Sequence, residues 1–119
     1  SVMLGSRREV LALEPDYAAL SDLCIGVTGP WDSIHDGQQA QFEVRAFAMA
    51  CGVNEDPVTG SLNAGLAQWL IGSGLAPEHY IASQGTCLGR AGRVHVDQEN
   101  GKIWVGGGAT TLIKGVLRL

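Results

Sequence analysis

The chain has 119 residues, of which 45% are hydrophobic and 17% are charged, and its net charge at pH 7 is −4. The length predicts one domain, residues 1–119, that can bury a core without disulfide bonds, and the composition is that of a globular protein. The acidic balance argues against a nucleic-acid partner, and the lack of a long apolar run argues against a membrane partner.

The first forty residues predict two strands with a helix between them. "REVLAL" at 8–13 predicts a strand, and a short helix is expected over 14–23, because a proline and an acid near its start suit the first turn of a helix. "CIGVTG" at 24–29 predicts the second strand, and the polar, turn-rich residues 30–40 predict a loop.

Residues 41–49, "QFEVRAFAM", alternate between apolar and polar side chains, with Phe47 as the exception. This alternation predicts a strand with one buried face. Arg45 would then lie on the polar face, where a surface ion pair is the usual arrangement.

The next element is a helix at roughly 58–71, and its apolar residues cover nearly the whole circumference. A helix that is apolar all round is buried, so Trp69 is expected in the core. The "GSG" that follows provides a left-handed cap at Gly72 or Gly74, and Pro77 prevents the helix from continuing.

The last third of the chain predicts strands only. "YIASQG" at 80–85 is one, and 92–107 is a hairpin whose alternating residues flank Asn100-Gly101, the pair that a tight two-residue turn prefers. Residues 108–119 predict a closing strand. Together these elements predict an α+β domain in which a curved, mostly antiparallel sheet wraps around one central buried helix.

Cysteine and histidine spacing gives little support for a metal site. The three cysteines, Cys24, Cys51 and Cys87, are odd in number and no two have CxxC spacing, which is typical of reduced thiols in a cytoplasmic protein. The three histidines show neither HxxxH nor HxxE spacing, and the start of the chain lacks the pattern of a signal peptide. We therefore expect a cytoplasmic protein without a metal.

The stretch "EDPVTGS" leads into the predicted helix and is the candidate site. In one register Asp56 is the N-cap; in the other Thr59 is the N-cap and Gly60 begins the helix, which leaves the amides of Gly60, Ser61 and Leu62 free. Free amides and the positive end of the helix dipole bind anions, and glycine allows a ligand to approach the backbone. We prefer the second register, because Thr-Gly-Ser is small and open.

Simpler interpretations stand beside this one. Asp56 before a proline is often only a helix cap, and Glu55 is more often a solvated turn acid. Cys51 is more often a small buried residue than a nucleophile, because no histidine is near it in sequence, and His95 is expected to be exposed.

The segment "RAFAMACGVNEDPVTGSLNAGLAQWL", residues 45–70, resembles the signature of the PhzF family of phenazine-biosynthesis isomerase-like proteins. "QGTCLGRAGRVHV" at 84–96 and "KIWVGGGATTLIKGVLRL" at 102–119 are similar to two further motifs of the family. The resemblance implies a diaminopimelate-epimerase-like fold, in which two similar domains enclose an active site between their helix N-termini. It also implies that this chain corresponds to the C-terminal half.

The resemblance carries site roles onto matching residues. Asp56 and Ser61 match the active-site aspartate and serine of the family, and they are the candidate catalytic residues. Thr59, Gly60, Ser61 and Asn63 are the candidate substrate-binding residues, with the amides of Gly60 and Ser61 expected to hold a substrate carboxylate.

The second motif supplies Gln84, Gly85 and Arg90, whose role is expected to be mainly structural. The family's principal acid/base is a glutamate in the N-terminal domain, which no residue here matches. This chain departs from the family at Leu62-Asn63, where many members have Ala-His, so a titratable imidazole is missing beside the site.

These observations support three hypotheses. The first is one half of an isomerase that moves a proton at carbon in a small carboxylated metabolite without a cofactor, and that has little or no activity without its N-terminal domain. The second is a free-standing homodimer that binds a small anion or only assembles, because a lone domain of a two-domain parent exposes an apolar face. The third is an inert fragment with a stable fold.

Overall fold

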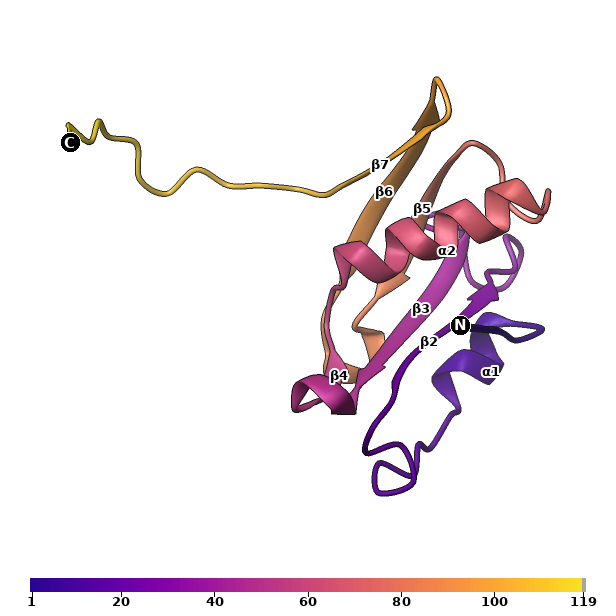
Figure 1. Ribbon diagram of the computed structural model, residues 1–119. Helices are drawn as coiled ribbons and strands as arrows, with labels where there is room; N and C mark the ends of the chain where they lie inside the picture. Colours follow the sequence, from indigo (N-terminus) through magenta and orange to yellow (C-terminus); the bar gives the residue numbers. More distant parts are fainter. Residues whose placement is uncertain (119) are drawn as a thin grey trace.

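The computed structural model describes residues 1–118, an α+β fold with one mixed seven-stranded sheet and two helices (Figure 1). The strands are β1 (Val2–Met3), β2 (Cys24–Pro30), β3 (Phe42–Ala48), β4 (Val53–Asp56), β5 (His79–Gln84), β6 (Gly92–Glu99) and β7 (Lys102–Gly106). The helices are α1 (Arg7–Leu11) and α2 (Gly60–Gly72), and two 3-10 turns are η1 (Met49–Cys51) and η2 (Thr86–Leu88). Neither helix has the length and apolar character that crossing a membrane requires, a finding limited to the described residues.

The strand order is β1-β2-β3-β5-β6-β7, with β4 also paired to β3. The pairs β1–β2 and β3–β5 are parallel, and the other pairs are antiparallel. β5 and β4 share one edge of β3: β5 pairs with its first half and β4 with its second half. The sheet is therefore open and does not close around the helix.

The strands expected over 24–29, 41–49 and 80–85 are confirmed, and so is the hairpin. Asn100 and Gly101 both have positive φ, 51° and 74°, as the tight turn between β6 and β7 requires. Gly74 has φ of 70° just beyond the end of α2, so of the two glycines it is the one in the left-handed conformation.

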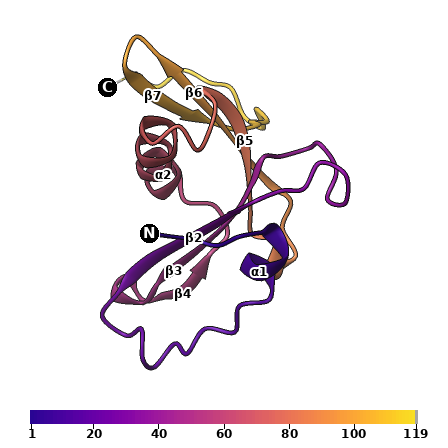
Figure 2. The same ribbon diagram turned by 90° about the vertical axis from the view of Figure 1, so that its right-hand side faces the viewer.

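Helix α2 lies on one face of the sheet and is not enclosed by it (Figure 2). Its residues Leu66, Ala67 and Leu70 are buried against β3, β5 and β6 in the main core. Trp69, however, is 39% exposed. The prediction of a helix buried all round was wrong, because an open sheet covers only one side of it.

Both faces of β3 are buried, and this corrects the prediction of a single buried face. Phe42 and Val44 point to α2, whereas Phe47 packs with Val10 of α1 and Val27 of β2 in a second cluster. Helix α1 lies across the sheet from α2 in Figure 2. The polar residues of β3 are thus covered: Arg45 by α1 and the segment after it, and Glu43 by α1, the 31–41 loop and η2.

The N-terminal segment differs most from its prediction. Residues 8–13 were expected to be a strand, but 7–11 form α1, because the Ser6 hydroxyl accepts a hydrogen bond from the Glu9 amide (3.2 Å) and the Glu9 carboxylate accepts one from the Gly5 amide (2.9 Å). The Ser6-to-Glu9 spacing is that of a capping box, except that Glu9 reaches the amide of the residue before the N-cap. No helix forms over 14–23, where the Asp16 carboxylate instead accepts two amides of a turn.

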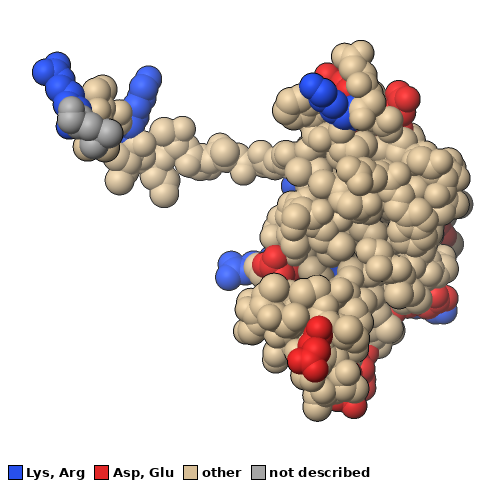
Figure 3. Space-filling view, viewed as in Figure 1, with Lys and Arg blue, Asp and Glu red and all other residues tan. Residues whose placement is uncertain are grey.

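Residues 107–118 form a tail that extends away from the body without strand pairing, which corrects the closing strand expected over 108–119; residue 119 lies outside the described residues. Figure 3 shows the tail standing clear of the globule. Its apolar side chains are 81–91% exposed, and they are Leu112, Ile113, Val116 and Leu117.

Candidate functional site

The acidic turn adopts the second of the two registers. β4 ends at Asp56, Thr59 is the N-cap with extended backbone (φ −122°, ψ 97°), and α2 begins at Gly60. The preferred register, with Gly60 as the first helical residue, is confirmed.

The Thr59 side chain does not cap the helix. Its hydroxyl donates instead to Oδ2 of Asp56, at 2.6 Å. The first amide of this region with an intrahelical bond is that of Asn63, which donates to the Thr59 carbonyl at 3.1 Å. The amides of Gly60, Ser61 and Leu62 therefore have no hydrogen-bond partner within residues 1–118. Gly60 and Ser61 are exposed, so a helix N-terminus with free donors faces solvent.

Gln84, at the end of β5, holds this turn in place and is fully buried. Its amide nitrogen donates to the Asp56 carbonyl (2.9 Å) and to the Thr59 hydroxyl (3.0 Å). Its amide oxygen accepts from the Thr59 amide (3.1 Å) and from Asn63 (2.8 Å). The hydroxyl of Thr59 thus accepts from Gln84 and donates to Asp56, which fixes the direction in which that carboxylate points.

Two glycines, Gly85 and Gly92, allow β5 and β6 to lie close to the turn that leads into α2. A Cβ at Gly85 would lie 2.7 Å from the Pro57 carbonyl oxygen, and Gly85 also has φ of 88°. A Cβ at Gly92 would lie 2.6 Å from the Gln84 carbonyl oxygen. The motif from Gln84 to Gly92 therefore packs β5 and β6 against the turn, which agrees with the structural role expected for Gln84 and Gly85. The Arg90 amide closes the loop by donating to the Gly85 carbonyl at 2.9 Å.

Asn63 lies beneath the turn, with 1% of its surface exposed. Its amide nitrogen donates to the Thr59 carbonyl (2.9 Å) and to Gln84. In this structure Asn63 positions Thr59 and does not reach solvent, so the accessible part of the candidate site is formed by Asp56, Thr59, Gly60 and Ser61.

A cavity of about 350 Å³ opens beside the start of α2. Thr59, Ser61 and Leu62 line it from the helix side, and Cys24, Ile25, Gly26, Ala46, Phe47, Ala48 and Cys51 line most of the rest. Neither Asp56 nor Gly60 lines it; Asp56 is linked to its wall through the Thr59 hydroxyl. The cavity combines an apolar wall with helix-end donors, and this suits a small molecule that carries one anionic group.

Two predictions about charged residues near the site were wrong. Glu55 is 9% exposed and Arg45 is 4% exposed, and the two form a bidentate pair with N···O distances of 2.8 and 2.9 Å. Arg45 also donates to the carbonyls of Val10 and Leu13. The hydrogen bond to Glu55 raises the pKa of Arg45 further. Glu55 is therefore a buried structural acid, and Arg45 is not in a surface pair.

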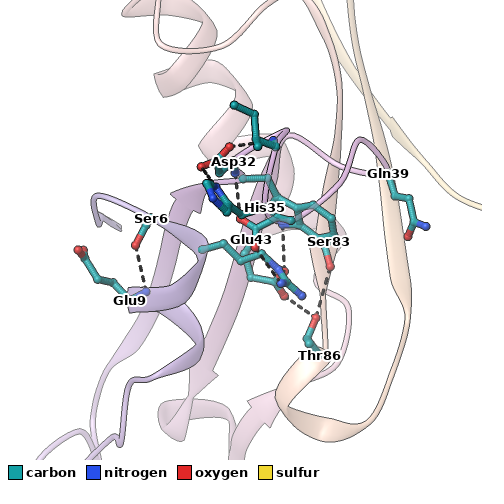
Figure 4. A network of polar contacts seen from close by, with 12 residues as sticks. Ser6, Glu9, Asp32, His35, Gln39, Glu43, Ser83 and Thr86 are labelled. Atoms are coloured by element: carbon teal, nitrogen blue, oxygen red, sulfur yellow. Dashed lines mark hydrogen bonds and ion pairs between the residues drawn. The ribbon is translucent and has the colours of Figure 1, made fainter.

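A second buried carboxylate, that of Glu43, lies at the centre of the network in Figure 4. Oε2 accepts from Arg7 (3.2 Å) and from the Trp31 indole (3.1 Å), and Oε1 accepts from Thr86 (2.6 Å). The Arg7 guanidinium also lies 4.4 Å from the centre of the Trp31 ring. These contacts join α1, the 31–41 loop and η2 over one face of β3. They engage both oxygens of Glu43, so the network is a structural one.

The cysteines and histidines do not form a metal site within residues 1–118. Cys51 is exposed and lines the cavity, so the prediction of a small buried residue was wrong. No spacing in the sequence signals that Cys24 and Cys51 meet there. His95 is exposed, as predicted. Among residues 1–118 no group of three or more metal-binding side chains is present.

A larger hollow, of about 660 Å³, lies near the other end of α2 and includes Gln68, Gly72 and Trp104 but none of the candidate site residues.

Comparison with known proteins places these features in context. The family model PhzC-PhzF, described as phenazine biosynthesis-like protein, matches residues 1–115. An uncharacterized isomerase of Pseudomonas aeruginosa is 35% identical over 121 residues, and the match covers 99% of this chain but 43% of that protein.

Solved structures agree with the sequence comparison. The crystal structure of a phenazine biosynthesis PhzF family protein from Enterococcus faecalis superposes with a TM-score of 0.74 at 29% identity, covering 98% of this chain and 43% of that one. A putative PhzC/PhzF protein from Clostridium difficile gives a TM-score of 0.70 at 26% identity, covering 99% and 44%. The chain thus spans less than half the length of these relatives.

Proposed function

The chain belongs to the PhzC-PhzF family of phenazine biosynthesis-like proteins, and from this we propose that it supplies the carboxylate-binding half of an isomerase that moves a proton at carbon without a cofactor. The observation that carries the proposal is the exposed start of α2, where the amides of Gly60, Ser61 and Leu62 have no partner within residues 1–118. A substrate carboxylate would accept from these amides and from the Ser61 hydroxyl.

Asp56 would act next to this anion site. Its Oδ2 is held by the Thr59 hydroxyl, and Thr59 is held in turn by Gln84. Oδ1 of Asp56 has no hydrogen-bond partner within residues 1–118, so it is available to accept from a substrate group or from water. A proton acceptor that is fixed beside the bound carboxylate can orient or shuttle the proton of the reacting carbon.

The principal acid/base of the reaction is not assigned to this chain. Two glutamates are the obvious candidates in this chain: Glu55, which is next to Asp56 in sequence, and Glu43 in β3. Both carboxylates are buried and already bonded, Glu55 to Arg45, and Glu43 to Arg7, Trp31 and Thr86. We therefore propose that the chain needs a second domain to supply this group and to exclude water from the site, and that the chain alone has little or no isomerase activity.

Anion binding can be tested by following backbone amide resonances during a titration with malonate, a small dicarboxylate. Saturable shifts are expected at Gly60, Ser61 and Leu62. Ser61→Ala should weaken binding about tenfold, because one hydrogen bond to a charged group is worth about 1.5 kcal/mol.

The matched control is Ser73→Ala, since Ser73 follows the other end of the same helix, and it should bind malonate like the unmodified chain. Shifts spread evenly along α2, or equal binding by Ser61→Ala, would contradict the anion site. Isomerase turnover by the purified chain, at the rate of a full-length relative, would contradict the need for a second domain.

A second candidate is self-assembly, and the exposed tail favours it. Leu112, Ile113, Val116 and Leu117 are apolar and exposed, and Figure 3 shows a broad area around α2 with few charged side chains. Apolar surface of this kind is typical of an interface. In a symmetric homodimer two copies of the α2 N-terminus could face one cleft. Light scattering of the purified chain tests this candidate, which a monomer at all concentrations would exclude.

A further inference from the structure

Two of the three cysteines meet at the rim of the 350 Å³ cavity. Cys24 is the first residue of β2 and Cys51 is the last residue of η1. Their sulfur atoms lie 3.8 Å apart, both side chains are exposed, and both line the cavity together with Thr59 and Ser61. The third cysteine, Cys87, is in η2, where its sulfur contacts the Leu11 carbonyl at 3.7 Å.

The fold brings this pair together by backbone contacts on both sides. Cys24 pairs with Ala48 in the β2–β3 ladder, so the chain leaves β3 directly beside it. The Ala50 amide then donates to the Leu23 carbonyl at 3.3 Å, which ties η1 to the residue before Cys24. Gly52, with φ of 75°, reverses the chain into β4. The proximity of the two thiols therefore follows from the sheet register.

The distance is that of two sulfur atoms in van der Waals contact. A disulfide bond is about 2.05 Å long, so closure needs an approach of about 1.8 Å. Cys51 is in a three-residue 3-10 turn that ends at a glycine, so a small rotation of exposed side chains and of this turn can provide the approach. Two thiols are also too few to hold zinc, which takes four ligands, and no further metal-binding side chains join them within residues 1–118.

We propose that Cys24 and Cys51 are a redox modification site, a reversible dithiol–disulfide pair at the rim of the candidate cavity, oxidised by exchange with small aliphatic disulfides of the glutathione class. In the oxidised form a covalent bridge joins β2 to η1 beside Thr59 and Ser61. The proposal concerns the thiols only and does not depend on anion binding or on isomerase activity.

The exchange proceeds in two balanced steps. The Cys51 thiolate attacks one sulfur of glutathione disulfide, forming a mixed disulfide and releasing one glutathione thiolate. The Cys24 sulfur then attacks Sγ of Cys51 and releases the second glutathione. Two protein thiols are oxidised, one disulfide is reduced to two thiols, and the two protons go to the leaving glutathione sulfurs. Cys24 is not the first nucleophile because, in the reduced pair, its hydrogen bond with Cys51 raises the pKa of its thiol.

The experiment equilibrates the purified chain with increasing glutathione disulfide, traps free thiols with iodoacetamide and maps the cysteines by mass spectrometry. The expected product has lost two hydrogens, carries a Cys24–Cys51 peptide cross-link and reverts with dithiothreitol. Cys87 is the internal control. The pair should be half-oxidised at a glutathione disulfide concentration about tenfold lower than the one that half-modifies Cys87, because its second step is intramolecular.

The variant Cys24→Ser distinguishes the proposed reacting pair from cysteines that are modified only because they are exposed. It should retain glutathione on Cys51 as a stable mixed disulfide, because the second step is removed. Mixed disulfides on all three cysteines of the unmodified chain at similar concentrations, or a cross-link that involves Cys87, would overturn the proposal. So would an unmodified chain that stays fully reduced under conditions in which Cys24→Ser takes up glutathione.

Discussion

Arg45 was placed on a solvent face by its alternation in the sequence, yet its guanidinium is buried and bonded to Glu55, Val10 and Leu13. Alternation assigns residues to two faces of a strand but does not say what covers each face. Here α1 covers the second face, and the sequence alone predicted no helix there. The start of α2 was easier to predict, because Thr-Gly-Ser marks a helix start by local chemistry.

At the residue scale, Glu55→Gln should destabilise the fold by about 3–5 kcal/mol, because it leaves the Arg45 charge buried without its counter-ion. Urea denaturation measures this change. Glu99→Gln, at the exposed end of β6, is the matched control and should stay within about 0.5 kcal/mol of the unmodified chain. The double variant Arg45→Met with Glu55→Leu should be more stable than Glu55→Gln alone. If the double variant were the less stable of the two, the assignment of Arg45 and Glu55 as a buried ion pair would be contradicted.

At the scale of elements, the sequence predicted five of the seven strands and the start of α2, but not α1. The hairpin and α2 were predictable because their signals are local: Asn-Gly between alternating residues, and an apolar run after Thr-Gly-Ser. Helix α1 has a local signal too, the Ser6-to-Glu9 capping box, but its five residues give too little periodicity to be recognised against the pattern of a strand. β4 is short and is defined only by its pairing to β3.

The contact between the β5–η2 turn and the start of α2 can be tested with Gly85→Ala. Gly101→Ala is the matched control, because Gly101 also has positive φ but a Cβ there would meet no atom within 4 Å. We expect Gly101→Ala to cost about 1 kcal/mol for backbone strain alone. Gly85→Ala should cost more, by about 1–3 kcal/mol, because its Cβ also meets the Pro57 carbonyl. Thermal and urea unfolding measure both variants, and equal losses would argue against tight packing at this turn.

At the scale of the whole molecule, the tail could not be predicted from its sequence. "TTLIKGVLRL" has the β-branched and apolar content of a strand, but a strand also needs a neighbour, and within residues 1–118 the tail has none. The composition of a segment sets its preference for extended backbone. The surface that it can bury against decides whether that preference becomes a sheet.

Removal of residues 109–119 should leave the free energy of unfolding within about 0.5 kcal/mol, because the described part of this segment adds no buried residue to either core cluster. The same truncation should lower self-association, which light scattering over a range of concentrations measures. The double variant Leu112→Ser with Ile113→Ser keeps the length and should reproduce the effect. A marked loss of stability on truncation would show that the tail packs on the body.

The parallel joint between β3 and β5 has a kinetic consequence. It consists of three residue pairs, from Phe42↔Ala82 to Val44↔Gln84, and it connects β2-β3-β4 on one side to β5-β6-β7 on the other. Within each half, most strand pairs are antiparallel and join strands that are near in sequence, and such pairs form quickly. The parallel β3–β5 pair can form only after the chain between these strands, which contains β4 and α2, has folded back to bring them together. We therefore expect assembly of the two halves to be the slow event in folding, and Gln84, fully buried at the end of this joint, to be protected only when the halves have joined.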